Sequence, residues 1–146
     1  RRLAESALEK LQPFFARAKG PWTARVALPG GGFHYNAVPE LTSALKAQFG
    51  FLSDYWAARL IRAYGSEAAA VLGNARKPAD LGRDFGATLT EAEVRWLMAH
   101  EFACTAADVV WRRTKLGLRM TQDQMAALDV FMASAEGHGA VSPAAE

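Results

Sequence analysis

The chain has 146 residues, of which 51% are hydrophobic, so it can bury one adequate core but hardly two. Its 17 basic and 15 acidic residues give a formal net charge of +2, far from the dense basic charge of a dedicated nucleic-acid-binding protein. The single cysteine, Cys104, excludes an internal disulfide and a cysteine-cluster metal site, and we expect it to be a buried thiol in a reducing compartment.

The first part of the chain combines one helix with an irregular segment. Apolar residues at spacings of three and four predict a helix over residues 3–15, which Pro13 shortens or kinks. Residues 22–28 are too short for a confident helix, so a strand and an extended linker both stay open. The glycines and prolines that follow predict an irregular loop near residues 20–38.

Three helices are predicted in the middle of the chain. Residues 39–49 begin with a proline, which suits the first helical turn, and stop before Gly50. Residues 53–64 and 66–72 are each followed by a glycine, which favours a helix end. Residues 74–87 contain glycine and proline and are predicted to form a structured loop.

Three capping-box sequences mark the starts of the last three predicted helices. Each box begins with a threonine, at Thr90, Thr105 and Thr121, and has an acid or amide three residues later. The threonine oxygen accepts from the later backbone N–H, and the later side chain accepts from the threonine N–H. Glutamate and glutamine are the usual partners, so the Thr105 box, which has Asp108, is expected to be the weakest.

These elements predict an all-α fold. We expect a compact orthogonal bundle of about six to seven helices in one domain, residues 1–134. Residues 135–146 are small and polar and are predicted to be a tail. The sequence starts without a methionine or a signal-peptide apolar region, so we expect it to be part of a longer protein.

Two charged residues fall on stripes of apolar side chains. Continuing the helical spacing places Glu101 on the apolar stripe of the helix after Thr90, and Arg113 on that of the next helix. If the two helices pack antiparallel, these residues would form a partly buried pair; the alternative is that one or both reach solvent. Asp108 and Arg112 are four residues apart and are predicted to pair at the surface.

The sequence contains no recognisable catalytic or metal-binding motif. Its three histidines are far apart, and the Gly30–Gly32 run lacks the lysine and glycine spacing of a phosphate-binding loop. No serine lies in a nucleophile motif. We therefore expect no catalytic, cofactor-binding or metal-binding residue in this chain.

Without a catalytic motif, the functions left open are binding functions. Four basic residues lie on or just after the helix predicted at 105–119, and with the helix before it they imitate a helix-turn-helix that binds nucleic acid. The imitation is imperfect, because the adjacent Arg112 and Arg113 point about 100° apart and Arg113 lies on the apolar stripe. A helical packing or interface module is favoured.

The strongest motif lies in the last third of the chain. It consists of the pair Glu101-Phe102, the box from Thr105 to Asp108, and the sequence Arg112-Arg113-Thr114-Lys115-Leu116. With the Leu28-Pro29-Gly30-Gly31 turn, this pattern resembles the C-terminal domain of FAD-dependent aerobic glycerol-3-phosphate dehydrogenases.

The resemblance implies an enzyme whose larger, N-terminal domain binds FAD and substrate and is absent from this chain. That enzyme would oxidise sn-glycerol 3-phosphate to dihydroxyacetone phosphate and reduce a membrane quinone. This chain lacks a dinucleotide-binding fingerprint, so it is expected to bind no FAD and to be inactive alone. Glu101, Asp108, Arg112, Arg113 and Lys115 correspond to the family motif and are expected to be structural or interface positions only.

The resemblance also suggests partners. The first is the N-terminal flavin domain of the same chain; a homodimer and a peripheral association with the inner, cytoplasmic face of the bacterial membrane are further expectations. Nucleic acid is not an expected partner. No apolar run reaches the roughly 18–20 residues of a membrane-spanning helix, and no amphipathic stretch stands out as an anchor.

Overall fold

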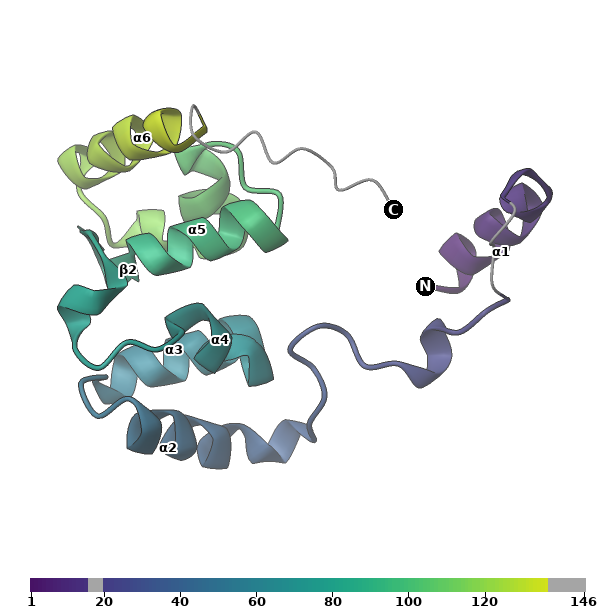
Figure 1. Cartoon of the computed structure of the whole chain (residues 1–146), viewed down its shortest axis with the longest axis horizontal. Helices are drawn as coiled ribbons and strands as arrows, with labels where there is room; N and C mark the ends of the chain where they lie inside the picture. The colour runs from purple at the N-terminus through teal and green to yellow at the C-terminus, as the bar shows by residue number, and fades with distance from the viewer. Residues whose placement is uncertain (16–19, 137–146) are drawn as a thin grey trace.

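The computed structural model describes residues 1–15 and 20–136, so most of the predicted tail, residues 137–146, lies outside the described part of the chain. The described residues form six α-helices and one two-stranded hairpin (Figure 1). The helices are α1 (Arg2–Leu11), α2 (Val38–Gln48), α3 (Asp54–Tyr64), α4 (Ala68–Leu72), α5 (Glu91–His100) and α6 (Gln122–Glu136). The strands are β1 (Asp84–Gly86) and β2 (Leu89–Thr90). The predicted helical fold is confirmed.

The bundle has two layers. Helices α2, α3 and α4 lie together in one layer and α5 and α6 in the other, with the hairpin at one edge between them (Figure 1). Side chains from all five helices form one buried cluster, in which Leu60 of α3, Val94 of α5 and Leu128 of α6 are fully buried. Burial of this apolar surface is the main force that holds the layers together.

Local sequence chemistry explains the ends of the middle helices. The Ser53 hydroxyl accepts a hydrogen bond from the backbone N–H of Trp56 at 3.2 Å and caps α3, which begins next to Ser53 as the sequence predicts. Pro39 lies in the first turn of α2, where its missing N–H costs nothing. Helix α3 ends at Tyr64 and is followed by Gly65, whose φ of 55° is costly for other residues.

The glycine-rich turn is fixed against the end of α3. The N–H of Gly31 bonds to the carbonyl of Leu28 at 2.8 Å, and the N–H of Ser66 bonds to the carbonyl of Gly30 at 3.0 Å. A Cβ atom added to Gly65 would lie 2.0 Å from the Gly30 carbonyl oxygen, so the two backbones approach more closely than any side chain allows. The turn is thus a structured attachment point for the chain that precedes it.

The N-terminal part of the chain lies away from the bundle (Figure 1). Helix α1 stops at Leu11, and Pro13 lies in a following 3₁₀ turn, Gln12–Phe14, which confirms that this proline shortens the helix. Residues 22–28 contain one 3₁₀ turn, Thr23–Arg25, and form no strand, so the linker alternative is correct. No residue of α1 is buried.

The hairpin is an element that the sequence analysis did not predict. Strands β1 and β2 pair antiparallel, with Asp84 opposite Thr90 and Gly86 opposite Leu89. The two loop residues, Ala87 and Thr88, have φ values of 50° and 69°. A two-residue loop with both φ values positive is the type I′ turn, which normally contains asparagine and glycine. The local sequence therefore gave no hairpin signal.

The segment after Thr105 also differs from the prediction. Instead of a regular α-helix it forms a π-helix, Asp108–Arg113, in which the N–H of Thr114 bonds to the carbonyl of Val109 at 3.0 Å. Because the π-helix bonds residues five apart, Thr114 lies one helical turn after Val109 and on the same side. In an α-helix, Arg113 would occupy that position. A 3₁₀ turn, Leu116–Leu118, follows.

The last helix runs slightly further than predicted. Helix α6 continues to Glu136, so Ala135 and Glu136 are helical rather than part of a tail. None of the described helices is both long enough and apolar enough to cross a membrane.

Candidate functional site

The residues of the sequence motif lie together in the turn between α5 and α6. The guanidinium Nε of Arg113 donates to the backbone carbonyl of Glu101 at 2.9 Å and lies 3.9 Å from its carboxylate Oε2. Both side chains are 37% exposed. The predicted contact is therefore present, whereas the placement of Arg113 on the core stripe is wrong, because the π-helix puts Thr114 there.

Asp108 organises the start of the π-helix. Its Oδ2 accepts hydrogen bonds from the Thr105 N–H at 2.9 Å and from the Cys104 N–H at 3.1 Å, and the N–H of Asp108 bonds to the Thr105 hydroxyl at 3.2 Å. Its Oδ1 accepts from Arg112 at 2.6 Å, which confirms the predicted pair. The backbone N–H of Thr105, then its hydroxyl and the Cys104 N–H, lower the pKa of Asp108 to about 2.

The Thr105 box is therefore fully formed, and the expectation that it is the weakest of the three is wrong. The Thr121 box is also formed, with both of its hydrogen bonds to Gln124, at 2.9 and 3.2 Å. Thr90 makes no capping bond with its side chain. Cys104 is exposed rather than buried, because the bond from its N–H to Asp108 places it in the surface turn.

Lys115 closes this segment. Its φ of 59° lies in the left-handed region, and its ammonium group donates to the carbonyl of Trp111. The Trp111 ring in turn covers Gly117, where an added Cβ would lie 2.6 Å from the ring. All five motif residues thus make contacts within the segment 101–115: Glu101, Asp108, Arg112, Arg113 and Lys115. This segment is not a continuous α-helix. The helix-turn-helix alternative, which needs a regular recognition helix at 105–119, therefore has no structural support.

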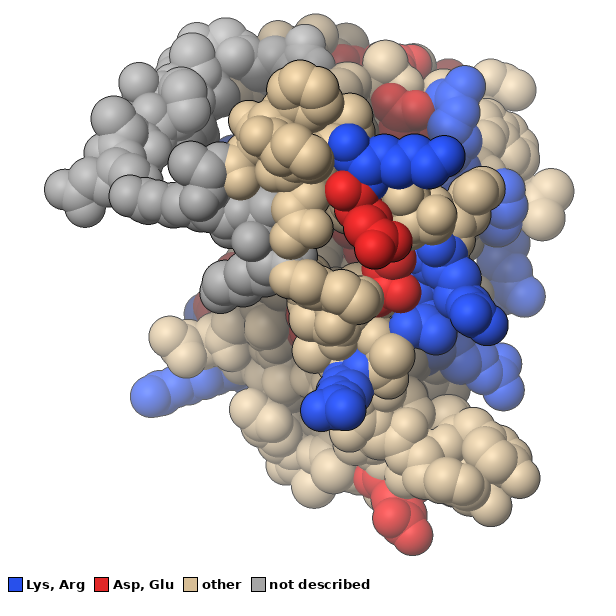
Figure 2. All heavy atoms as spheres, turned by 90° about the vertical axis from the view of Figure 1, so that its right-hand side faces the viewer, with Lys and Arg blue, Asp and Glu red and all other residues tan. Residues whose placement is uncertain are grey.

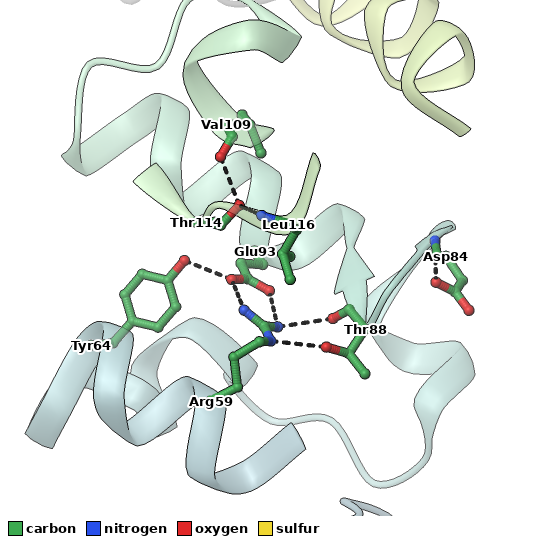
Figure 3. A network of polar contacts seen from close by, with 9 residues as sticks. Arg59, Tyr64, Asp84, Thr88, Glu93, Val109, Thr114 and Leu116 are labelled. Atoms are coloured by element: carbon green, nitrogen blue, oxygen red, sulfur yellow. Dashed lines mark hydrogen bonds and ion pairs between the residues drawn. The ribbon is translucent and has the colours of Figure 1, made fainter. Parts of the chain in front are cut away.

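The buried charges of the bundle lie elsewhere, between α3 and α5 (Figure 3). Both terminal nitrogens of Arg59 donate to the two carboxylate oxygens of Glu93, at 2.7 and 2.6 Å. The hydroxyl of Tyr64 donates to Glu93 Oε1 at 2.7 Å. The Glu93 side chain is 1% exposed and that of Arg59 is 11% exposed, so the pair is almost dry. It connects the two layers of the bundle.

The same arginine fixes the hairpin turn. Arg59 Nε donates to the Thr88 hydroxyl at 2.8 Å, and one terminal nitrogen donates to the Thr88 carbonyl at 2.9 Å (Figure 3). A β-branched residue with positive φ costs about 1–3 kcal/mol and persists only where its surroundings fix it. Arg59 supplies that constraint, so helix α3 determines the conformation of a loop 29 residues later in the chain.

This network is built for structure rather than proton transfer. Burial first, and then the adjacent negative charge of Glu93, raise the pKa of Tyr64 above its ordinary value, so its hydroxyl stays protonated and donates. All buried side-chain nitrogen and oxygen atoms among the described residues have a hydrogen-bond partner. Both oxygens of Glu93 are therefore engaged by Arg59, and Oε1 also by Tyr64.

Spacing along the chain does not predict this network, although one signal points to it. Glu93 lies four residues before Leu97, on the buried side of α5, and this spacing predicts burial. The capping-box pattern instead assigned Glu93 to Thr90. The competing partner, Arg59, is 34 residues away and could not be identified from spacing.

The described residues do not fit a flavin site. A dinucleotide is normally held by a glycine-rich turn after a parallel strand, at the start of a helix. The described part of the chain contains only an antiparallel hairpin, which leads into α5 through Thr90 with no glycine-rich turn. It also contains no group of three His, Cys, Asp or Glu side chains placed to hold a metal ion.

The chain is similar in sequence to a known protein family. A family model described as the C-terminal domain of alpha-glycerophosphate oxidase matches residues 21–142. The glycerol-3-phosphate dehydrogenase of Pseudomonas aeruginosa is 41% identical over 138 residues, which are 94% of this chain and 27% of that protein. The aerobic glycerol-3-phosphate dehydrogenase of Escherichia coli is 38% identical over 90% of this chain and 26% of its own length.

A third relative carries another substrate in its name. The D-erythritol 1-phosphate dehydrogenase of Brucella abortus is 35% identical over 87% of this chain and 25% of its own length. The chain thus spans about a quarter of the length of these curated relatives. It belongs to the family defined by the C-terminal domain of alpha-glycerophosphate oxidase.

Proposed function

We propose that this chain is the C-terminal domain of an enzyme that oxidises sn-glycerol 3-phosphate to dihydroxyacetone phosphate. The secondary alcohol loses two electrons and two protons, and a quinone takes them up to become a quinol. The observation that carries this proposal is the family match over residues 21–142, together with the two glycerol-3-phosphate dehydrogenases that align with most of the chain.

The proposed role of this domain is structural. Its buried acid is paired with Arg59 and Tyr64. In the motif, Arg113 bonds to Glu101 and Arg112 to Asp108, while Lys115 bonds to the Trp111 carbonyl. FAD would be held by the N-terminal domain of the same polypeptide, because the described residues do not fit it. We therefore expect the 146-residue chain alone to have no dehydrogenase activity.

A second substrate is supported by one relative. The Brucella abortus protein is named for D-erythritol 1-phosphate, a polyol phosphate one carbon longer than glycerol 3-phosphate. Because this domain aligns comparably with enzymes named for either substrate, the longer polyol phosphate is the second candidate. The choice would be made by residues of the N-terminal domain.

We also propose where the parent enzyme acts and how it assembles. The parent enzyme would act in the cytoplasm, peripherally bound at the inner face of the bacterial cytoplasmic membrane, where quinone is available. A homodimer is part of the same proposal. The exposed Arg112 would offer a positive charge to such partners, although it already pairs with Asp108.

A steady-state assay tests the function. The full-length protein, a version truncated before Arg1 and the 146-residue chain would each be given glycerol 3-phosphate or D-erythritol 1-phosphate, with an artificial electron acceptor. Activity only in the full-length protein would support an assisting C-terminal domain, and the preferred substrate would decide between the candidates. Activity in the truncated protein would show that this domain is dispensable for chemistry. No oxidation of either substrate would refute the proposal.

A further inference from the structure

Helix α1 presents an apolar stripe to solvent. Leu3, Leu8 and Leu11 are 85%, 61% and 47% exposed, and the two aromatic residues just after the helix, Phe14 and Phe15, are 80% and 59% exposed. The polar side of the helix is engaged instead: Glu5 accepts a hydrogen bond from the Thr23 N–H at 3.2 Å. Isolated helices shorter than about 12–15 residues are marginal in water, so a ten-residue helix with a bare apolar face needs a packing partner.

The bounds of the family match and of the alignment with a relative indicate which part of the polypeptide contacts α1. The family model of the C-terminal domain begins at residue 21, after α1. The alignment with the Pseudomonas aeruginosa relative covers 138 of the 146 residues, so at most eight residues lie outside it and the alignment reaches into α1. At least the last residues of α1 are therefore shared with the relative, and the whole helix lies outside the C-terminal domain model. Most of the relative's length lies outside the aligned region.

The charge of α1 favours a protein surface over a lipid surface. Helices that lie on membranes carry a basic polar face beside the apolar one. Within α1 the basic Arg2 and Lys10 are balanced by the acidic Glu5 and Glu9. Arg1, before the helix, lies 3.8 Å from the carboxylate of Glu5, and Arg25 adds one positive charge after it. Figure 2, in which the side of the molecule that carries α1 faces the viewer, shows acidic side chains between basic ones rather than one basic field.

A second copy of the chain is also a weaker candidate than a domain of the same polypeptide. Stable interfaces between separate chains usually bury about 1,200–2,000 Å² in total, and one ten-residue helix offers only a small part of that. A domain joined by the chain itself avoids much of the entropy cost of association.

We infer that residues 1–15 and 20–28, here called the docking arm, pack through the apolar side of α1 on the N-terminal domain of the same polypeptide. The turn at Leu28–Gly31, bonded to the end of α3, is then the point where the chain passes from that domain to the bundle. This inference deepens the proposed function by naming the surface that meets the N-terminal domain. The boundaries predicted from sequence, 1–134, would then include a segment that belongs to the interface.

Amide hydrogen exchange, measured by mass spectrometry, tests the inference. We expect the amides of α1 to exchange at least about ten-fold more slowly in the full-length protein than in the 146-residue chain, because docking must open before they exchange. The amides of α3 and α5 should exchange equally in both proteins, which shows that the bundle is intact. Equal exchange of α1 in the two proteins would overturn the inference.

Two matched variants of the full-length protein sharpen the test. Leu8→Gln and Leu118→Gln each replace a leucine that is exposed in this structure, at 61% and 79%. Losing one buried leucine contact corresponds to roughly a ten-fold or larger change in an equilibrium constant, so Leu8→Gln should speed α1 exchange about ten-fold while Leu118→Gln leaves it unchanged. Equal effects would contradict docking by α1. The wild-type comparison stands even if Leu8→Gln fails to fold.

Other partners give different results. Protection of α1 in the 146-residue chain that rises with protein concentration would identify a second copy, and protection that requires phosphatidylglycerol vesicles would identify lipid; either would overturn the inference. The outcome is separable from that of the enzyme assay. Substrate oxidation with an unprotected α1 would refute docking alone, whereas a protected α1 without oxidation of either polyol phosphate would refute the proposed function alone.

Discussion

Replacing Arg59 by methionine removes the positive charge of the buried network but keeps most of the side-chain volume. Glu93, which is 1% exposed, would lose its bidentate partner and retain only the hydrogen bond from Tyr64. Breaking a buried ion pair from one side typically costs about 3–5 kcal/mol, because the remaining charge is left uncompensated. The Thr88 turn would also lose the two bonds that hold its positive φ.

The expected free-energy loss corresponds to a melting temperature lower by roughly 10–20 °C for a chain of this size. Urea unfolding of the 146-residue chain, followed by circular dichroism, would measure it directly. The double variant Arg59→Met/Glu93→Leu removes both charges and should recover most of the loss, since buried pairs are often replaced by apolar residues at little cost. It would not recover all of it, because the hydroxyl of Tyr64 loses its acceptor.

Two results would refute this reasoning. A loss below about 1 kcal/mol for Arg59→Met would mean that Glu93 finds water or another partner, as a surface pair does. A double variant as unstable as the single one would mean that the hydrogen bonds to Thr88, rather than the unpaired charge, dominate. The variant Thr88→Ala tests one of these hydrogen bonds by itself, because it removes the hydroxyl bonded to Arg59 Nε and keeps the bond to the Thr88 carbonyl.

Three further changes test other parts of the structure. Arg113→Ala should lower the free energy of unfolding in urea by less than about 1 kcal/mol, because solvent screens its half-exposed pair with Glu101. The prediction would be contradicted if Arg113→Ala were much more destabilising than Lys115→Ala. The pKa of Asp108 is depressed to about 2, so the stability that its carboxylate contributes is complete above the unfolded pKa near 4 and is lost as the pH falls toward 2. In Asp108→Asn the free energy of unfolding should therefore depend less on pH between about 4 and 2, and an unchanged pH dependence would rule out Asp108 as its source. Gly65→Ala places a Cβ 2.0 Å from a carbonyl oxygen and should lower the melting temperature by many degrees, whereas Gly32→Ala, with open space around it, should change it little; equal effects would show that the turn is not held against α3.

Much of the helical framework follows from short stretches of sequence. Ser53 caps α3 by a bond to a backbone N–H three residues away, and Gly65 ends the same helix because its φ is positive. Pro13 ends α1 early for an equally local reason. Such signals depend only on residues within a turn of one another, so they can be predicted without knowledge of the rest of the fold.

The motif around Asp108 was predictable in part. The spacing of Asp108 and Arg112 indicates their ion pair, and the approach of Glu101 and Arg113 follows from two helices joined by a tight turn. The exposure of Arg113 was not predictable, because α-helical spacing fails in a π-helix. The hydrogen bond from the N–H of Thr114 to Val109 changes which residue faces the core.

By itself, the sequence determined the helical class, the places where most helices begin and end, and the resemblance to the family. Only the tertiary structure decided the partner of Glu93, because Arg59 and Tyr64 approach it from a different helix, and their charge and hydrogen bonds outweigh the local pairing with Thr90. It likewise decided the hairpin, since two hydrogen bonds from Arg59 hold Thr88 at its positive φ. Local signals specify backbone conformation over one turn, whereas the pairing of a buried charge depends on which distant side chains the packed layers bring within hydrogen-bond distance.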